Sequence, residues 1–283
     1  MSIRLKMMNA AERAEKSLGD SADRVRFFLY SQINSDGGFK GRTDASDLYY
    51  TVFGIEALLA LHADVPVKKI LNYLRQFEDI ESLDLVHLAC LVRCRTGLSA
   101  DPFSKDTIDK ILQLAEKYYA QQNSIYSCFF TIGLYQDLNI ELPRRSTVIN
   151  RIELLRTADG AYANDTAIKI GSTPATAAAI TLLSSLNAPV THESADWLLH
   201  RCLPEGGFAA MPMAPIPDLL STAVAIHALS QVNAEINSIK DKCLKFVNRL
   251  WSDNGGFRGI EAEQTIDCEY TYYGLLALGH LAQ

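Results

Sequence analysis

One short pattern returns along the chain: a Gly-Gly-aromatic turn, followed by an apolar stretch that opens on a polar residue. The stretch "NSDGGFKGRTDASDLYYTVFGIEALLAL" (34–61) is echoed near the C-terminal end by "SDNGGFRGIEAEQTIDCEYTYYGLLALGHL" (252–281) and between them by "PEGGFAAMPMAPIPDLLSTAVAIHALSQV" (204–232). A repeat of this kind cannot bury its own apolar face, so neighbouring copies must stack against one another. This repeat constrains the fold more than any other feature of the sequence.

Six copies of the repeat can be aligned on the polar residue that opens each apolar stretch. The stretches are rich in Ala, Leu, Gly and aromatic residues and are about four turns long, which predicts helices buried on all sides. The opening residues lie 37 to 49 positions apart and are Asp47, Asp84, Asn123, Ser172, Asp218 and Asp267. We expect these stretches to be the inner helices of the fold.

An amphipathic segment precedes each apolar stretch and predicts an outer helix with one side in water. These segments are "SADRVRFFLYSQ", "PVKKILNYLRQFED", "DTIDKILQLAEKYYAQ", "STVINRIELLRT", "THESADWLLHRC" and "NSIKDKCLKFVNRLW". No strand pattern lies between the paired helices, so an all-α fold is expected. Helix pairs in series can form an open solenoid or a closed ring, and the close match of the first and last copies favours the ring. We predict an all-α (α/α)6 toroid as one barrel domain over residues 20–283, with residues 1–19 as an N-terminal helical lead-in.

Composition excludes several classes of protein. The 283-residue chain has a formal net charge of −6 with scattered Lys and Arg residues, which argues against a nucleic-acid partner. No window reaches the roughly 18 apolar residues of a membrane span, and the start of the chain lacks the apolar stretch of a signal peptide. The six cysteines fall inside apolar helical patterns, as reduced core residues do. We therefore expect a soluble cytoplasmic protein.

The first Gly-Gly-aromatic turn carries a resemblance to a known family. Its sequence "QINSDGGF" (32–39) and the inner helix that follows resemble the QxxDGGF-like repeat of the prenyltransferase and squalene-cyclase superfamily. A single barrel of six repeats is most similar to the β subunits of protein prenyltransferases. The resemblance implies an α/α toroid, a central site for an isoprenoid diphosphate, and a helical-repeat α subunit as partner.

The resemblance also implies roles for residues of the first two repeats. Arg42 in "GGFKGR" takes the place of a diphosphate-binding arginine, and Tyr50 that of a tyrosine that hydrogen-bonds the phosphate. Asp47 and His87 take two metal-ligand positions, which implies a site for Zn²⁺ or Mg²⁺. The zinc thiolate ligand is missing, because Tyr49 stands at its position.

The last repeat shows the complementary pattern. Asp267 is in place, Cys268 comes one residue early, and Glu269 occupies the ligand position. A shift of one residue on a helix turns a side chain by about 100°, so Cys268 is not expected to replace the missing thiolate.

The polar residues that open the inner helices meet at one mouth of the expected ring. Asp, Asn and Ser are preferred helix N-caps, which is a sufficient explanation for each of them singly. As a ring, the converging helix N-termini and carboxylates favour either a cation site or a proton donor.

Aromatic residues on the inner helices either fill the core or line a pocket that suits an isoprenoid chain. Arg42 is either a phosphate ligand or a solvated loop charge. The expected substrate-binding residues are Arg42, Tyr49, Phe53, Tyr126, Phe129 and Tyr270.

The function favoured by the sequence is a prenyltransferase-like enzyme that binds an isoprenoid diphosphate in the barrel and transfers or ionises it. Arg42 and the helix N-termini would stabilise the leaving diphosphate. Asp47 and His87 would bind a metal or orient the acceptor, and Tyr50 would hydrogen-bond the phosphate.

Two other functions stay open. A class II terpene cyclase-like enzyme would use a rim aspartate, Asp267 or Asp218, as general acid, although the chain has no DxDD motif. A non-catalytic barrel would bind a lipid or a partner protein, and the missing thiolate favours it.

Overall fold

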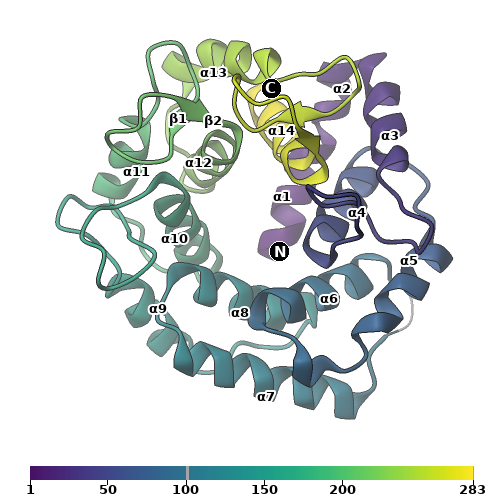
Figure 1. Ribbon diagram of the computed structural model, residues 1–283. Helices are drawn as coiled ribbons and strands as arrows, with labels where there is room; N and C mark the ends of the chain where they lie inside the picture. Colours follow the sequence, from purple (N-terminus) through teal and green to yellow (C-terminus); the bar gives the residue numbers. More distant parts are fainter. Residues whose placement is uncertain (100–101, 283) are drawn as a thin grey trace.

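Within residues 1–99 and 102–282, the part of the chain that the computed structural model describes, six helices form an inner ring (Figure 1). They are α4 (Leu48–Ala60), α6 (Leu85–Gly97), α8 (Ile125–Asp137), α10 (Thr173–Ser185), α12 (Leu219–Gln231) and α14 (Cys268–Leu281). Each inner helix packs against the next along the chain, and α14 packs against α4 as well as α12. The ring is closed, which confirms the toroid and excludes the open solenoid.

The amphipathic segments form the outer layer (Figure 1). The outer helices are α3 (Ser21–Ser31), α5 (Val67–Leu74), α7 (Lys105–Gln121), α9 (Arg145–Glu153), α11 (His192–Leu199) and α13 (Asn237–Arg249). Two short 3-10 turns, η1 (Arg75–Phe77) and η2 (Ile80–Ser82), lead from α5 to α6. The outer helices bury one face each, whereas the inner helices are buried along most of their length, as the two hydrophobic patterns predict.

Each inner helix begins at a polar N-cap whose side chain accepts a hydrogen bond from a backbone N–H in the first turn. Five of these caps were expected from the alignment and are Asp47, Asp84, Ser172, Asp218 and Asp267. In the third repeat the prediction of Asn123 is wrong, because Ser124 is the cap. The hydroxyls of Ser124 and Ser127 each accept the other residue's backbone N–H, and this capping box starts the helix one residue later.

The glycine turns let the chain pass close to a neighbouring outer helix. Gly37 has φ 103°, and a Cβ there would lie 2.0 Å from the carbonyl oxygen of Lys69 at the start of α5. Gly255 has φ 93°, and a Cβ there would lie 2.1 Å from the carbonyl oxygen of Arg24 in α3. Other residues would be strained and would clash at both positions. The second contact joins the last repeat to the first and helps close the ring.

The aromatic residue of each turn is buried beneath its inner helix. Its backbone N–H donates to a threonine hydroxyl one turn into that helix, so the turn and the helix hold each other. The pairs are Phe39 with Thr51, Tyr162 with Thr176, Phe208 with Thr222, and Phe257 with Thr271.

The last two turns widen into short antiparallel hairpins, which the sequence pattern did not predict. Strand β1 (Phe208–Ala209) pairs with β2 (Pro217–Asp218), and β3 (Phe257–Arg258) pairs with β4 (Ile266–Asp267). Strands of two residues are too short to show alternation in the sequence. They fix the backbone directly before the N-caps of α12 and α14.

The N-terminal segment forms α1 (Ile3–Glu12) and α2 (Ala14–Leu18), and α1 lies in the middle of the ring (Figure 1). It packs against α4, α8, α10 and α14. The Ile3 N–H donates to Gln136 Oε1 at 2.8 Å, and Arg13 Nε donates to the Gly279 carbonyl at 3.0 Å. Because Gln136 and Gly279 lie late in inner helices, α1 covers the end of the ring where the inner helices finish.

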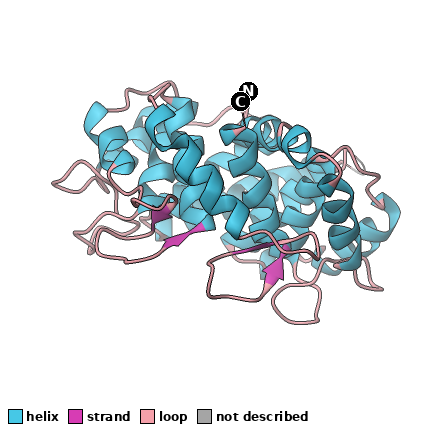
Figure 2. Cartoon of the chain, turned by 90° about the horizontal axis from the view of Figure 1, so that it is seen from above, coloured by secondary structure: helices cyan, strands magenta, loops and turns pink. Residues whose placement is uncertain are grey.

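The two ends of the ring therefore differ. Figure 2 shows both termini at one end and the long turns and hairpins at the other, where the inner helices begin. We call the end with the turns the mouth and the end covered by α1 the floor. None of the helices formed by residues 1–99 and 102–282 is long and apolar enough to cross a membrane.

Candidate functional site

The inner helices and α1 enclose a cavity of about 400 Å³, within the range typical of small-molecule sites. Because the inner helices share one register, the side chains that line the cavity form layers. The mouth layer, two positions after each N-cap, consists of Tyr49, Val86, Tyr126, Pro174, Leu220 and Glu269. All of these line the cavity except Glu269, which contacts the lining residue Tyr49.

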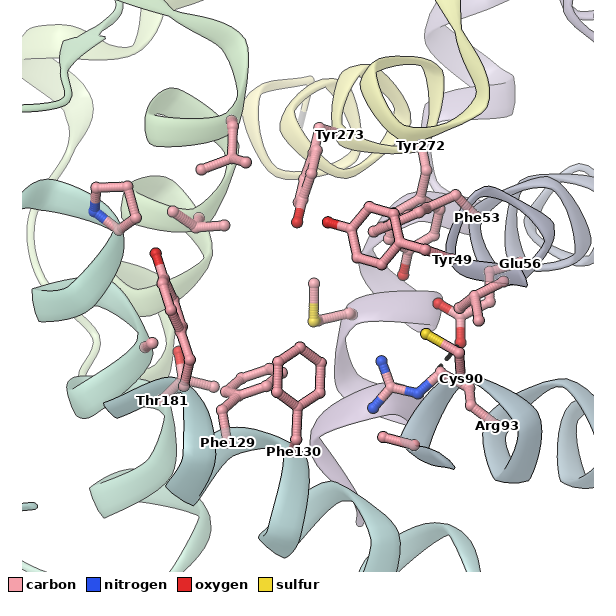
Figure 3. Close-up of a pocket in the computed structure, with 18 of the residues that line it drawn as sticks. Tyr49, Phe53, Glu56, Cys90, Arg93, Phe129, Phe130, Thr181, Tyr272 and Tyr273 are labelled. Atoms are coloured by element: carbon pink, nitrogen blue, oxygen red, sulfur yellow. Dashed lines mark ion pairs between the residues drawn. The ribbon is translucent and has the colours of Figure 1, made fainter. Parts of the chain in front are cut away.

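The next layer inward, which we call the waist, combines aromatic and small side chains. Its aromatic residues come from α4, α8 and α14 and are Phe53, Phe129, Phe130, Tyr272 and Tyr273 (Figure 3), and its small residues come from α6, α10 and α12 and are Ala89, Cys90, Ala177, Ala178 and Val224. An elongated apolar ligand can lie against the small residues of the neighbouring helices α10 and α12 with its other edge on ring faces. Such faces also stabilise positive charge near them.

Asp267 lies at the mouth, at the seam between the last and first repeats. Its residue exposure is 2%, and its Oδ1 accepts the Tyr270 backbone N–H at 2.8 Å. Its Oδ2 makes no hydrogen bond within the described part of the chain, and the Arg42 Nε atom lies 3.5 Å away. A buried carboxylate oxygen without a hydrogen-bond donor is costly when charged.

Glu269 stands one turn before Tyr273 on α14, so both side chains share the face that looks into the ring. The Tyr49 hydroxyl donates to Glu269 Oε1 at 2.6 Å across the seam between α4 and α14. In Figure 3 the ring of Tyr49 lies at the cavity beside Tyr273. At the mouth, Glu269 is therefore the carboxyl group that is hydrogen-bonded to a lining residue of the cavity.

Both carboxyl groups at the mouth hold their protons more tightly than an exposed carboxyl does. Burial is the main cause that raises the pKa of Asp267, and the charge of Glu263 adds to it. Burial also raises the pKa of Glu269, with a further contribution from Asp267. Two neighbouring carboxyl groups with raised pKa values are suited to donating a proton.

Arg42 is shared among several partners at the mouth. Its Nη1 lies 3.5 Å from Glu263 Oε1, its Nε lies 3.5 Å from Asp267 Oδ2, and its guanidinium lies 5.3 Å from the centre of the Tyr270 ring. The side chain is 48% exposed, so solvent screens these ion pairs. An incoming diphosphate would have to compete with Glu263 and Asp267 for this arginine.

A second charged group lies at the floor. Arg93 Nε donates to Asp137 Oδ2 at 3.1 Å and lies 3.9 Å from Glu56 Oε1, which accepts from Arg4 Nε at 2.9 Å. Burial by itself lowers the pKa of Arg93, but Asp137 and Glu56 outweigh it and raise the pKa above its usual value. This network joins α1, α4, α6 and α8.

The residues of the implied metal site have other partners. Asp47 Oδ1 accepts the Tyr50 N–H at 3.1 Å, and His87 Nδ1 lies 2.8 Å from Asp84 Oδ1. A catalytic zinc needs three protein ligands and an open position. Residues 1–99 and 102–282 contain no group of three His, Cys, Asp or Glu side chains placed to hold a metal ion. The donor set does not fit such a centre, and the metal prediction stays a prediction.

The residues expected from the sequence divide into three groups. Four of them line the cavity, namely Tyr49, Phe53, Tyr126 and Phe129. Asp267 is one of the carboxyl groups at the mouth, and Arg42, Tyr50 and Tyr270 lie around it, where hydrogen bonding links Tyr50 to Arg42. Asp47 and His87 do not line the cavity.

Several residues of the cavity escaped the sequence reasoning. Glu56, Arg93, Thr181 and His227 all line the floor, and each stands nine positions after its N-cap. Glu269 was noted as a replaced ligand and not as an acid. The four floor residues could have been found in the sequence, because each is a polar or charged residue in the middle of an otherwise apolar helix and all four occupy the same position of the repeat.

A closed α/α ring around an apolar cavity defines the class of protein, and comparison with known families gives the same result. The family model of the prenyltransferase alpha-alpha toroid domain matches residues 3–87, 105–194 and 176–283. The chain therefore belongs to the prenyltransferase alpha-alpha toroid family. A comparison with curated proteins finds no match.

Solved structures share the fold at low sequence identity. A protein from Actinoplanes is 16% identical with a TM-score of 0.62, and the match covers 93% of this chain and 99% of that one. A variant of the type II terpene cyclase MstE from Scytonema, in complex with geranylgeranyl dihydroxybenzoate, is 12% identical with a TM-score of 0.56, covering 95% and 97%. Candida albicans protein geranylgeranyltransferase-I complexed with GGPP is 16% identical with a TM-score of 0.49, covering 99% and 82%.

Proposed function

We propose that the protein is a type II terpene cyclase-like enzyme, which holds an isoprenoid chain in the central cavity and protonates it from the mouth. The observation that carries this proposal is the pair of buried carboxyl groups, Asp267 and Glu269, at the mouth of an aromatic-lined cavity. Burial raises the pKa of both, and an oxygen of Asp267 has no hydrogen-bond partner within residues 1–99 and 102–282. The type II terpene cyclase with the same fold, which binds a geranylgeranyl substrate, supports the same reading.

In this mechanism Glu269 is the general acid. The Tyr49 hydroxyl holds Oε1 of Glu269, which leaves the proton on Oε2 free to move to an alkene carbon. A C–H bond forms with the electrons of the C=C bond, and a tertiary cation remains on the neighbouring carbon. Another C=C bond of the chain then attacks this cation and closes a ring. Proton loss from an adjacent carbon re-forms a C=C bond and returns the proton to the Glu269 carboxylate, so the acid is regenerated and the product is a cyclic isomer of the substrate.

The surrounding residues support each stage of this reaction. The charge of Asp267 raises the pKa of Glu269, and Arg42 offsets the negative charge left at the mouth. Rings of the waist, including Phe53 and Tyr273, stabilise the cation. Proton loss to bulk water is limited because the apolar waist excludes solvent.

Turnover of geranylgeraniol by the full chain tests this proposal, with products extracted and identified by gas chromatography and mass spectrometry. We expect cyclic isomers from the wild type and a rate lower by about 10²–10⁴-fold for Glu269→Gln, the range for losing a general acid. Glu261→Gln, which alters an exposed carboxylate paired with Arg249, serves as the matched control and should retain full activity. Binding without turnover in the wild type would contradict the proposal and favour a non-catalytic barrel.

Arg42 favours a second candidate function, the ionisation or transfer of a prenyl diphosphate that the sequence suggested first. It lies at the mouth, where a helix N-terminus and a guanidinium can hold a phosphate. A helical-repeat partner subunit belongs to this candidate. The two reactions differ in one product: ionisation of geranylgeranyl diphosphate releases pyrophosphate, whereas protonation leaves the C–O bond intact. Pyrophosphate release that is lost in Arg42→Gln would favour the second candidate.

A further inference from the structure

The floor of the cavity is polar, in contrast to the waist above it. Nine positions after the N-cap, four inner helices carry polar side chains that line the cavity, and these are Glu56, Arg93, Thr181 and His227. The equivalent position of α8 is Gly133, where a Cβ would lie 3.3 Å from the Nη2 atom of Arg93. The absence of a side chain at Gly133 leaves space for the guanidinium.

Arg93 presents hydrogen-bond donors to this floor. Its Nε is held by Asp137 and Glu56, and Figure 3 shows its two terminal nitrogens turned toward the middle of the cavity. Its side chain is 20% accessible, against 5% for Glu56 and 4% for Asp137. The accessible polar surface of the network is therefore made mainly of N–H groups, which require an acceptor.

The charge of the network decides what kind of acceptor fits. Arg4 and Arg93 carry two positive charges, and Glu56 and Asp137 carry two negative charges, so the group is already neutral. An anionic group bound to Arg93 would be an additional buried charge that no member of this network is free to balance, which is strongly unfavourable. A neutral oxygen can accept from Arg93 without this cost.

His227 adds polarity to the floor without adding charge. Its Nδ1 lies 3.0 Å from His280 Nε2, and its Nε2 has no hydrogen-bond partner within the described ranges. Burial lowers the pKa of His227 to about 3, so the ring is neutral at physiological pH. On the α1 side, the nearby charges are those of Lys6 and Arg13, which oppose protonation of the ring further.

We infer that the floor is a binding site for the oxygenated end of a neutral isoprenoid, such as an alcohol or aldehyde, with that oxygen accepting a hydrogen bond from Arg93. This inference rests on the proposed function and names its substrate class. An isoprenoid bound with its oxygen at the floor places its far alkene at the mouth, beside Glu269. The same orientation keeps a diphosphate group away from the floor.

Binding of three C15 probes that differ in one end group tests the inference. Farnesol, farnesoic acid at pH 8 and farnesene are titrated into the full chain, and each Kd is measured by quenching of tyrosine and tryptophan fluorescence. A hydrogen bond to a charged donor predicts that farnesol binds at least about tenfold more tightly than farnesene. The carboxylate of farnesoic acid should bind more weakly than farnesol.

Variants of the floor residues test whether the preference for farnesol over farnesene comes from the floor. Arg93→Lys keeps the charge but replaces the planar fork, and it should reduce the preference for farnesol over farnesene several-fold. Thr181→Val, a near-isosteric change on the lining, should reduce it by a smaller factor and is expected to fold normally. Thr131→Val, a buried threonine of α8 that does not line the cavity, is the matched control and should leave all three Kd values unchanged.

The outcomes separate this inference from the proposed function. Equal Kd values for farnesol and farnesene in the wild type would overturn the polar floor while leaving an isoprenoid cavity in place. Tightest binding of farnesoic acid would overturn the neutral end group. A farnesol preference that survives unchanged in both Arg93→Lys and Thr181→Val would also overturn the inference. Binding of none of the probes would instead count against the proposed function itself.

Discussion

The mouth and the floor of the cavity contain the same kinds of side chain in opposite electrostatic states. Each end has two buried carboxyl groups with arginine nearby: Asp267 and Glu269 at the mouth, Glu56 and Asp137 at the floor. At the floor two arginines bond these carboxylates at 2.9 and 3.1 Å, so the charges balance. At the mouth the charges do not balance, and burial raises the pKa of both carboxyl groups.

The difference lies in the position of the arginines and not in the number of carboxyl groups. Arg4 and Arg93 come from α1 and α6 and are mostly buried, so each directs its donors at a carboxylate. Arg42 lies on the turn before α4, is 48% exposed and is shared between Asp267 and Glu263. A carboxyl group is therefore part of a charge-balanced network at one end of the cavity and, in the proposed function, a proton donor at the other.

Removing the floor arginine should have the largest effect on stability. Arg93→Met leaves Asp137 without its bonded cation in a buried position, and breaking such a pair costs about 3–5 kcal/mol. Urea unfolding followed by circular dichroism measures the loss. Arg24→Met removes an arginine that is 61% exposed and 4.0 Å from Asp253, and as a control it should cost about 1 kcal/mol or less. Equal losses in the two variants would show that the floor network does not stabilise the ring.

Neutralising the mouth should have a smaller effect of opposite sign. Because folding raises the pKa of Asp267, the folded state binds its proton more tightly than the unfolded state. Stability is therefore lost as pH rises from the unfolded pKa through the folded pKa, and the penalty persists above that range. Asp267→Asn keeps an N-cap and removes the penalty, so it should unfold at higher urea than the wild type at pH 7 but not at pH 4.

Free energies of unfolding measured from pH 4 to pH 8 for both proteins check the prediction for Asp267. A variant that is less stable than the wild type at pH 7 would mean that the ion pair with Arg42 outweighs the burial of the carboxylate. The matched change Asp253→Asn, at a 98% exposed carboxylate, should leave the pH dependence unchanged.

The smallest change in stability is expected for Arg42. Its side chain is half exposed, so Arg42→Gln should change the free energy of unfolding by about 1 kcal/mol or less. Arg42 lowers the pKa of both Asp267 and Glu269, and its removal should raise both values further. The pH at which geranylgeraniol turnover falls to half should then move upward in the variant. A downward shift in a pH–rate profile would contradict a protonated donor at the mouth.

Local sequence signals were enough to predict the repeating parts of this protein. The polar residue before each apolar run predicts an N-cap because its side chain satisfies an amide of the same helix turn, and five of the six residues were correct. The glycine turns and the alternation of buried and amphipathic helices follow from contacts within one repeat or between adjacent repeats. The similarity of the first and last copies also led to the correct prediction that the ring is closed.

Contacts between segments that are distant in the sequence could not be predicted from these local signals. Nothing in "MSIRLKMMNA" (1–10) predicts that α1 covers the floor, because its partners Glu56 and Gln136 lie far along the chain. The metal site at Asp47 and His87 and the helical partner subunit stay predictions for the same reason, since they depend on groups outside one repeat.

The sequence by itself determined the toroid and its repeats, because periodic burial and helix capping act over a few residues, but it left open whether the aromatic residues of the inner helices fill the core or line a pocket. Only the tertiary structure decided which buried carboxylates are paired with a mostly buried arginine and which are not. Glu269 and Glu56 look alike in the sequence, as acidic residues within apolar helices. Glu56 accepts a hydrogen bond from the mostly buried Arg4 and Glu269 from Tyr49, and which partner each one meets depends on the closed ring.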